Sequence, residues 1–367
     1  MANSFIPNFY PVILAGGRGT RFWPLSRKRR AKQLLPLNSS KSMIQETVER
    51  LEPLAPSDKF WIITNGDLHE PIVQQLPQLN PRQVLAEPVG RNTAPAIGLA
   101  AFILERTTPD AVIGMFPSDH VIVGEAEFRS DVRTAAKIAA ADPNIVVMGI
   151  KPTRAETGYG YIEVASGARQ DSLPVQGFVE KPEKDVAEQY LAAGNYFWNS
   201  GMFVWGAHTL ADALREHLPK TALILEQIAA TYGSAAFAAR FTELYPKCGN
   251  ISIDYAVLEP RSQKGNSGIF CVPAMFGWND LGSWTALYEH RCAEGAERQN
   301  IISSADSFTL HAQGNFVHSE KFVALVGVND LVIVETEDAL LITTRDKCQD
   351  VGKIVKYLDE KQLEKLV

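Results

Sequence analysis

Short apolar runs alternate with longer amphipathic stretches in the N-terminal part of the chain. Four runs have the length of buried strands, at residues 12–15, 60–64, 111–116 and 145–148. Two stretches between them have the length and pattern of helices, at residues 94–104 and 128–141. Because the strands are apolar throughout, they predict a parallel sheet with helices on both faces. Ligands of such sheets bind at the carboxyl ends of the strands, so the residues there are the first site candidates.

The remainder of the chain has a different pattern. Residues 151–285 are less regular and rich in aromatic residues, and we interpret them as an insertion that completes a pocket over the sheet. Later, short runs at close spacing predict stacked turns of a small β-structure, at residues 308–310, 316–317, 322–328, 331–334 and 339–343. A helix is predicted from about residue 351. Its apolar face, formed by Val351, Ile354, Val355 and Leu358, needs a partner in its own chain or in a homodimer.

Length and composition indicate a globular protein of two domains. The chain has 367 residues, against roughly 150 in an average domain, and we predict domains at residues 1–290 and 291–367. Hydrophobic residues make up 46% and charged residues 21%, as in ordinary globular proteins. The longest apolar run, residues 94–104, is shorter than the roughly 20 residues of a membrane span. Residues 1–10 lack a signal-peptide pattern. We expect a cytoplasmic protein without a membrane partner.

The charge distribution points to a small anionic ligand. With 36 Lys and Arg against 42 Asp and Glu, the net charge of −6 argues against a general nucleic-acid binder. Residues 18–32 nevertheless carry seven basic side chains and no acidic one: Arg18, Arg21, Arg27, Lys28, Arg29, Arg30 and Lys32. A solvated charged face is the alternative for such a run.

A glycine-rich segment with the sequence AGGRGTR, residues 15–21, directly follows the first predicted strand. Glycines let the backbone approach a ligand closely, and successive free N–H groups form a nest for anions. The spacing matches neither a P-loop nor a dinucleotide-binding loop, and Pro24 follows too soon for immediate entry into a helix. A simple turn would explain the glycines alone. Together with Arg21 and Lys32, they favour phosphate binding.

The motifs GGRGTRFWPLS at residues 16–26 and KQLLP at residues 32–36 resemble the signature of the sugar-1-phosphate nucleotidyltransferase family. The FWPLS form is most similar to family members that transfer guanylyl groups to mannose 1-phosphate. Further motifs follow in the family's order, at residues 87–95, 116–120, 157–162, 178–182, 198–203, 252–257 and 278–284. The resemblance is close over residues 10–285 and looser beyond. It implies an α/β fold with a Rossmann-like, GT-A-like mixed sheet flanked by helices, and a small β-helix-like C-terminal region ending in a helix.

The resemblance also implies a reaction and its residues. GMP would pass from GTP to α-D-mannose 1-phosphate, giving GDP-mannose and pyrophosphate. The attacking sugar phosphate is already largely ionised, so the site needs donors, fixed cations and a metal rather than a strong base. By resemblance, the catalytic cations are Arg21, Lys32 and Lys181. The implied nucleotide-binding residues are Leu14, Gly16, Gly17, Gly19, Thr20, Glu87, Arg91, Asn92 and Thr93. Either Glu87 or main-chain carbonyls near Leu14 would read the guanine.

The metal implied by the family is Mg²⁺, with Asp119 and Asp280 as its ligands. Asp119 follows a predicted buried strand, where the active-site carboxylate of an α/β sheet belongs, although an Asp there is also a common helix N-cap. Magnesium usually takes one or two protein carboxylates, and phosphate oxygens and water complete its shell. We expect His120 to be structural because magnesium prefers oxygen ligands.

The sugar-binding residues implied by resemblance are Gly158, Glu180 and Asn199. For Glu180 and Lys181 the alternative is a surface ion pair, which contributes little. Trp198, Trp278 and Trp284 either wall the pocket or belong to the core. Asp254 and Tyr255 lie in a family motif, and the sequence assigns them no chemical role.

Three other functions remain in view. The same chemistry could act on glucose 1-phosphate with UTP or dTTP, although the Phe22-Trp23 pair and residues 91–93 argue against it. A non-catalytic homologue that senses nucleotide sugars should have lost Arg21, Lys32, Asp119 or Asp280, and all four are present. An NAD-linked oxidoreductase is disfavoured by the glycine spacing.

Overall fold

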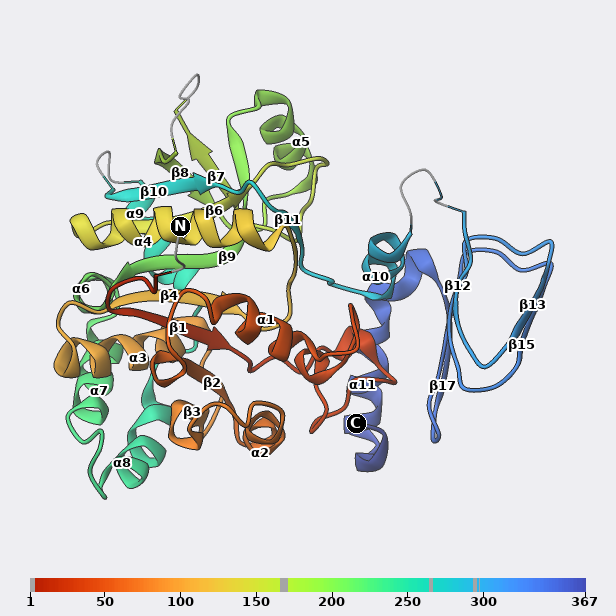
Figure 1. The fold of residues 1–367 in the computed structure, drawn as a ribbon, viewed down its shortest axis with the longest axis horizontal. Helices are drawn as coiled ribbons and strands as arrows, with labels where there is room; N and C mark the ends of the chain where they lie inside the picture. The colour runs from red at the N-terminus through yellow and green to blue at the C-terminus, as the bar shows by residue number, and fades with distance from the viewer. Residues whose placement is uncertain (1–3, 166–170, 264–266, 293–295, 297) are drawn as a thin grey trace. The chain divides into compact units, whose positions relative to one another are not determined.

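The computed structural model describes residues 4–165, 171–263, 267–292, 296 and 298–367 (Figure 1). The chain forms two compact units. Unit 1 comprises Met1–Gly16, Val48–Ser118 and Ile122–Trp278, and unit 2 comprises Gly17–Thr47, Asp119–Val121 and Asn279–Val367. The glycine-rich segment therefore leads from unit 1 into unit 2. These units are made of several segments each, so they differ in kind from the two continuous domains predicted at residues 1–290 and 291–367, which stay a prediction.

Unit 1 is built on a nine-stranded sheet with the order β3-β2-β1-β4-β9-β6-β10-β8-β7. Its strands are β1 (Phe9–Leu14), β2 (Trp61–Asn65), β3 (Val84–Glu87), β4 (Val112–Pro117), β6 (Ile145–Ile150), β7 (Tyr161–Val164), β8 (Leu173–Val179), β9 (Tyr196–Gly206) and β10 (Ile269–Pro273). Strands β1 to β4 are parallel, whereas β9 runs antiparallel to both β4 and β6. The mixed α/β fold is thus confirmed. The four strands predicted from the apolar runs, β1, β2, β4 and β6, are parallel to one another, and the antiparallel strand β9 comes from the middle of the chain.

The middle of the chain supplies strands to the sheet instead of an insertion over it. Strand β9 lies in the centre, where Trp205 pairs with Ile113 on one side and with Ile145 on the other. The sequence hides this strand for a local reason. Gly201 has a left-handed φ of 71°, and the register shifts between Val147 and Gly149 of the neighbouring β6. The apolar pattern is therefore interrupted midway.

Helices cover both faces of this sheet, as predicted. Neighbouring residues of a strand point to opposite faces. On β4, Met115 belongs to the core shared with α3 (Thr93–Thr107), whereas the ring of Phe116 lies 6.0 Å from that of Phe128 on α4 (Glu125–Ala141). Figure 1 shows α3 and α4 on opposite sides of the strands. The remaining helices and strands outside the β-rich region are α1 (Met43–Leu51), α2 (Gly66–Gln75), α5 (Lys184–Ala193), α6 (Ala207–His217), α7 (Pro219–Ala229), α8 (Phe237–Leu244), α9 (Glu259–Ser262), α10 (Trp284–Arg291), β5 (Val121–Val123) and β11 (Gly277–Asn279).

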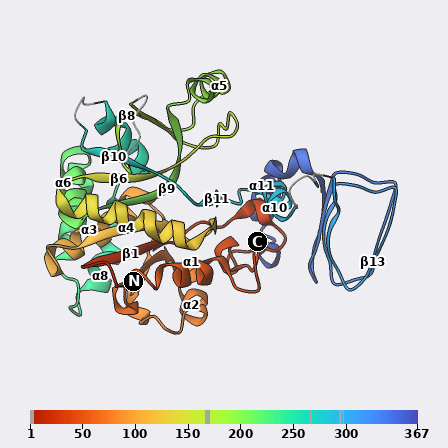
Figure 2. The same cartoon turned by 45° about the horizontal axis from the view of Figure 1, so that its top comes forward.

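Unit 2 contains the predicted stacked β-turns. Its strands are β12 (Ile301–Ser303), β13 (Ser307–Leu310), β14 (Phe316–His318), β15 (Val323–Val326), β16 (Leu331–Glu335) and β17 (Leu340–Thr344). From β12 to β16 the chain alternates between a four-stranded sheet, β12-β14-β16-β17, and a two-stranded sheet, β13-β15, and β17 then pairs antiparallel with β16. Figure 2 shows the resulting coil. Val317 and Leu325 are buried in the small core that this coil encloses.

A second core in unit 2 joins the segment after the glycine loop to the end of the chain. Trp284 is fully buried, its ring lies 4.9 Å from that of Phe22, and its Nε1 donates to the carbonyl of Trp23 at 3.1 Å. Helix α11 (Val351–Glu360) docks on the same core. Trp284 is therefore a core residue, and the predicted apolar face of the last helix is covered within its own chain.

None of the described helices combines the length and the apolar composition needed to cross a lipid bilayer.

The docking of α11 can be tested with two neighbouring positions. Leu358 is buried and Tyr357 is 55% exposed. Replacing Leu358 with Ala removes buried methyl groups and should lower the free energy of unfolding by about 2–5 kcal/mol, whereas Tyr357→Ala should change it by no more than about 0.5 kcal/mol. Urea denaturation followed by tryptophan fluorescence measures both. Equal effects of the two substitutions would contradict the docking of this face.

Candidate active site

In unit 2, the predicted site residues gather around the ammonium group of Lys32. Its Nζ donates to Oδ2 of Asp119 at 2.8 Å and to the main-chain carbonyl of Asp280 at 2.6 Å. The Lys32 side chain is only 6% exposed, and that of Asp119 is 36% exposed. A buried charge is tolerated when it is paired and hydrogen-bonded. Lys32, Asp119 and Asp280, which lie far apart in the sequence, are therefore brought together.

Asp119 carries a carboxylate rather than a neutral carboxyl group. Burial favours the neutral form, but the charges of Lys32 and His120 and the hydrogen bond from Lys32 outweigh it, so the pKa of Asp119 lies below its usual range. The alternative role of a helix N-cap is excluded, because α4 begins at Glu125 and is preceded by Gly124. An ionised carboxylate therefore lies just after β4.

The glycine loop is shaped by the approach of Lys32. Gly19 has a left-handed φ of 61°, and a Cβ at this position would stand 2.3 Å from Cβ of Lys32. Only glycine fits here. Gly17 differs, because an added Cβ would meet nothing within 4 Å. Thr20 begins a short 3₁₀ turn, Thr20–Phe22, and its carbonyl accepts the N–H of Trp23.

Arg21 lies beside the same group and also contacts the C-terminal region. A Cβ on Gly282 would stand 3.0 Å from Oδ2 of Asp280 and 3.5 Å from Nη1 of Arg21. The guanidinium of Arg21 donates to Oε1 of Gln349 at 2.9 Å. The C-terminal partner of Arg21 is a contact that no motif in the sequence indicated.

The carboxylates of Asp119 and Asp280 fit a magnesium ion in number and in chemistry. Among the described residues, no three His, Cys, Asp or Glu side chains form a cluster that could hold a metal by themselves. Two carboxylates are nevertheless what Mg²⁺ takes from a protein when phosphate oxygens supply further ligands. The donor set therefore suits a metal that arrives with a nucleotide.

In unit 1, Glu87 at the end of β3 lies in a buried, hydrogen-bonded setting. The hydroxyl of Tyr245 donates to its Oε1 at 2.6 Å, and the side chain of Glu87 approaches Gly16, where an added Cβ would stand 3.8 Å from Oε2. Burial raises the pKa of Glu87, and the bonds from Tyr245 and from the N–H of Arg91 oppose that shift. Sequence reasoning missed Tyr245, because it lies 158 residues away and outside the family motifs.

The three residues after Gly90 form hydrogen bonds within the protein near Glu87. The guanidinium of Arg91 donates to the carbonyl of Pro246. Asn92 has a left-handed φ of 66°, and its Oδ1 accepts the N–H of Thr93 at the start of α3. The hydroxyl of Thr93 accepts the N–H of Ile253 at 2.9 Å. Predicted as ligand-binding residues, all three make hydrogen bonds within the protein.

The carbonyl of Leu14 also makes a bond within unit 1, because it accepts the N–H of Ser118 at 3.1 Å.

A second group in unit 1 contains Glu180 and Lys181. Nζ of Lys181 donates to Oε1 of Glu180 at 2.5 Å. The pair is unlike a surface ion pair, since the Glu180 side chain is only 9% exposed and Lys181 has a strained φ of 50°. Gly160 makes room for Glu180, because a Cβ there would stand 2.4 Å from Oε2. The N–H of Gly158, a predicted ligand donor, instead bonds Oε1 of Glu156 at 3.1 Å.

Asn199 connects this second group to Asp254. Nδ2 of Asn199 donates to Oδ1 of Asp254 at 2.9 Å. Burial, followed by the negative charge of Glu180, raises the pKa of Asp254 to about 6. Because Ile253 is bonded to Thr93, one short segment links the second group to the residues around Glu87. The structure thus gives Asp254 a place in the site that the sequence left open.

Aromatic rings lie next to the second group, since the N–H of Lys181 bonds the carbonyl of Tyr159 at 3.2 Å. The ring of Tyr159 lies 5.3 Å from that of Trp198 and 5.2 Å from that of Trp278, both at edge-to-face angles. These rings belong to a small apolar cluster of their own. Trp198 and Trp278 are therefore close to the predicted sugar-binding residues of unit 1, in contrast to Trp284.

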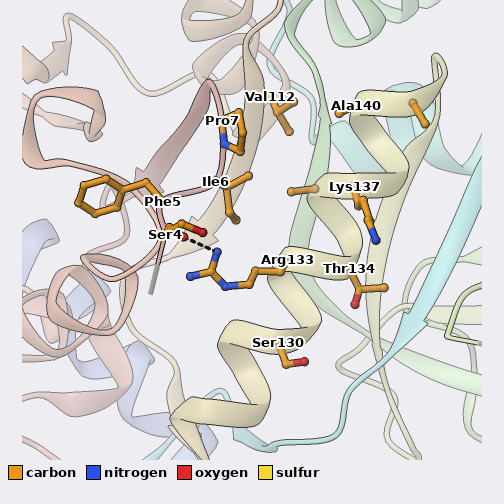
Figure 3. Close-up of a pocket in the computed structure, with 12 residues that line it drawn as sticks. Ser4, Phe5, Ile6, Pro7, Val112, Ser130, Arg133, Thr134, Lys137 and Ala140 are labelled. Atoms are coloured by element: carbon orange, nitrogen blue, oxygen red, sulfur yellow. Dashed lines mark hydrogen bonds between the residues drawn. The ribbon is translucent and has the colours of Figure 1, made fainter. Parts of the chain in front are cut away.

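A separate cavity of about 590 Å³ in unit 1 contains none of the predicted site residues. It lies between the segment around Ser4 and helix α4 (Figure 3). The guanidinium of Arg133 at its edge donates to the carbonyls of Ser4 and Pro53. Arg133 is thus bonded within the protein, and Lys137 of α4 also lines this cavity.

Comparisons with known proteins agree with both parts of the chain. The model of the nucleotidyl transferase family matches residues 10–297, and the model of a MannoseP isomerase/GMP-like beta-helix domain matches residues 307–358. The chain is 38% identical over 354 residues to a mannose-1-phosphate guanylyltransferase of Salmonella muenchen, covering 95% of this chain and 73% of the relative. It is 39% identical over 354 residues, with the same coverage, to the xanthan biosynthesis protein XanB of Xanthomonas campestris pv. campestris strain B100.

Solved structures show the same relationship. A crystal structure titled mannose-1-phosphate geranyltransferase, from Thermus thermophilus, matches with a TM-score of 0.84 and 32% identity, covering 96% of this chain and 99% of that one. A mannose-6-phosphate isomerase from Helicobacter pylori matches with a TM-score of 0.60 and 25% identity, covering 74% of this chain and 99% of that one. The chain is therefore an enzyme of the nucleotidyl transferase family and belongs to its mannose-1-phosphate guanylyltransferase group.

Proposed function

We propose that this enzyme transfers GMP from GTP to α-D-mannose 1-phosphate, giving GDP-mannose and pyrophosphate. The observation that carries the proposal is the gathering of Arg21, Lys32, Asp119 and Asp280 in unit 2, because it matches the inventory that phosphoryl transfer between two anions requires. The mannose-1-phosphate guanylyltransferases among the relatives supply the substrates of the proposal.

In this reaction an oxygen of the sugar phosphate attacks the α-phosphorus of the nucleotide. The bond from that phosphorus to the bridging oxygen breaks, and pyrophosphate leaves with the electron pair. No strong base is needed, since the attacking phosphate is ionised. Lys32 is held in place by two hydrogen bonds before any substrate binds, and such fixed charge stabilises a transition state without the cost of reorganisation. Arg21 would contribute a bidentate phosphate contact.

We propose Mg²⁺ as the metal, with Asp119 and Asp280 holding it. The low pKa of Asp119 supports this assignment, because a metal ligand must be deprotonated. When bound, the ion would supply Lewis-acid neutralisation of phosphate charge.

Glu87 is our candidate for the residue that reads guanine. Tyr245 bonds its Oε1, and the N–H of Arg91 also bonds the carboxylate. A carboxylate has about four lone-pair sites, so Glu87 can still accept hydrogen bonds from the N1–H and amino edge of the base. Adenine and uracil do not present that edge. The main-chain carbonyl of Leu14, the other candidate, already accepts the N–H of Ser118.

On the sugar side, we propose that Glu180 binds hydroxyl groups and that Lys181 reaches the sugar phosphate. The Lys181 side chain is 56% exposed, so its charge is available to a ligand. Burial lowers the pKa of Lys181, but the bond and charge of Glu180 outweigh that effect and keep the pKa above its usual value. Lys181 therefore remains a cation throughout the neutral range.

We place the enzyme in the cytoplasm, without nucleic-acid or membrane partners.

The proposed substrates can be tested by pyrophosphate release. With mannose 1-phosphate and magnesium, pyrophosphate should be released with GTP. Release should be at least about tenfold slower with ATP, UTP and dTTP, because these bases cannot form the hydrogen bonds that the site makes with guanine. Preference for UTP or dTTP with glucose 1-phosphate would instead support the alternative transferase. Binding of GDP-mannose without release from any pair of substrates would support the sensing homologue.

The role of Asp119 can be tested by Asp119→Asn, which keeps an oxygen for Lys32 but removes the charge. We expect kcat to fall by about 100-fold or more, the scale on which a transition-state electrostatic contact acts. The magnesium concentration needed for half-maximal rate should also rise. Asp58→Asn, at an exposed position of unit 1, is the control. Unchanged magnesium dependence in a folded Asp119→Asn enzyme would refute the ligand assignment.

The reading of guanine can be tested through Tyr245→Phe. This substitution removes the hydroxyl that favours the ionised form of Glu87, so the pKa of Glu87 should rise further and the acidic limb of kcat/KM for GTP should move to higher pH. ITP, which lacks the amino group of guanine, measures selectivity. We expect Glu87→Gln to reduce the preference for GTP over ITP by about tenfold. An unchanged preference in that variant would return the assignment to main-chain carbonyls.

A further inference from the structure

The resemblance gives Asn199 a direct contact with the sugar, but its amide is already engaged inside unit 1. Its Nδ2 donates to Oδ1 of Asp254 at 2.9 Å, and its Oδ1 accepts the N–H of Gly201 at 3.0 Å. The two bonds fix which end of the amide faces Asp254. Asn199 is therefore placed to orient a neighbouring carboxylate.

Glu180 has an acceptor that the protein does not use. Its Oε1 receives the ammonium of Lys181, whereas Oε2 is buried and has no hydrogen-bond partner among the described residues. A buried acceptor without a donor costs free energy, and native structures rarely keep one without a reason. The missing side chain of Gly160 is what lets this oxygen lie where it does, since a Cβ there would stand 2.4 Å from it. An O–H group of a ligand would satisfy Oε2.

Asp254 is a second carboxyl group near Glu180. A Cβ on Gly160 would stand 2.4 Å from Oε2 of Glu180 and 3.3 Å from Cβ of Asn199, whose amide bonds Asp254. The charge of Glu180 also acts on Asp254, and the charge of Asp254 acts on Lys181. Two carboxylates beside one ammonium leave a surplus of acceptors. A ligand that brings two hydroxyl donors matches that surplus better than a ligand that brings one.

We propose that Asp254 and Glu180 together accept hydrogen bonds from two hydroxyl groups of the sugar phosphate, with Asn199 as the residue that positions Asp254. This inference rests on the proposed function and extends it, because it makes Asp254 a specificity-determining residue. The preferred substrate class is a hexose 1-phosphate in which both hydroxyls are free.

The arrangement gives sugar binding a pH dependence of defined sign. The groups facing Asp254 are Glu180, whose charge raises its pKa, and Lys181 and Asn199, which lower it; burial has the largest effect, and the pKa lies at about 6. Tyr255, the next residue, is 49% exposed. Above pH 6 the carboxylate of Asp254 accepts a hydroxyl, and below pH 6 protonation removes that acceptor. The KM for the sugar phosphate should therefore rise as the pH falls through 6.

Asp254→Asn is the test variant, because it removes the charge and keeps an oxygen for Asn199. At pH 7.5 we expect the KM for mannose 1-phosphate to rise about tenfold or more, as the loss of a charged hydrogen bond implies. The KM for GTP should stay within about twofold. Asp185→Asn, an exposed position on α5, is the matched control and should behave like the wild type.

Two measurements separate a binding role from a structural one. The sugar phosphate itself titrates near pH 6, so the wild-type and Asp254→Asn profiles are compared, and only their difference reports on Asp254. A panel of mannose 1-phosphates, each lacking one hydroxyl, is then assayed with both enzymes. The analogue that lacks the hydroxyl bound by Asp254 should have a higher KM than mannose 1-phosphate in the wild type. In Asp254→Asn the two KM values should be equal, because the variant has already lost the partner of that hydroxyl.

Asn199→Ala provides a second variant if Asp254→Asn does not fold. Losing the hydrogen bond from Asn199 should raise the pKa of Asp254 and move the acidic limb of sugar binding to higher pH. An unchanged sugar KM in Asp254→Asn, identical analogue penalties in both enzymes, or an unmoved limb in Asn199→Ala would overturn the inference. Calorimetry measures the binding of mannose 1-phosphate directly and so tests the role of Asp254 without turnover. The proposed function is tested separately, because it fails if the wild type releases no pyrophosphate.

Discussion

The need to pair one buried ammonium group organises unit 2. Burying the charge of Lys32 would cost several kcal/mol if it had no partner. Its partners, the carboxylate of Asp119 and the carbonyl of Asp280, belong to two other segments of the chain. All three segments of unit 2 must therefore be in place before this charge is satisfied. The absence of a side chain at Gly19 is part of the same constraint, since Lys32 fills the space where a Cβ would be.

The same pairing suits the chemistry we propose. A free ammonium group would bind a triphosphate tightly in its ground state and would have to be immobilised in the transition state. Lys32 is immobilised beforehand by Asp119 and Asp280, so its charge is available at a fixed position. The carboxylate of Asp119, which holds Lys32, is also a proposed metal ligand, and Asp280 holds Lys32 through its main-chain carbonyl. Catalytic preorganisation and the folding of unit 2 thus depend on one set of contacts.

Sequence reasoning succeeded where the signal is local. The strand before Asp119 and the glycines before Arg21 were recognisable because a β-strand and a nest each need a short, regular pattern. The central strand β9 was missed because Gly201 and a register shift interrupt its pattern. Tyr245 was not recognised from the sequence, and Asp254 received no role, for another reason. Their partners lie 158 and 55 residues away, and a hydrogen bond over such a separation leaves no periodic trace in the chain.

The segment at residues 251–254 connects the proposed base-recognition and sugar-recognition groups of unit 1. The N–H of Ile253 bonds the hydroxyl of Thr93, at the start of α3, and Asp254 is the next residue along. A shift of this segment that opened the space at Asp254 would also strain the bond at Thr93. A side-chain hydroxyl and a main-chain N–H thereby couple the residues around Glu87 to those around Glu180. This coupling gives the motif at residues 252–257 a physical role that its composition does not reveal: it holds the two proposed recognition groups at a fixed spacing within one unit.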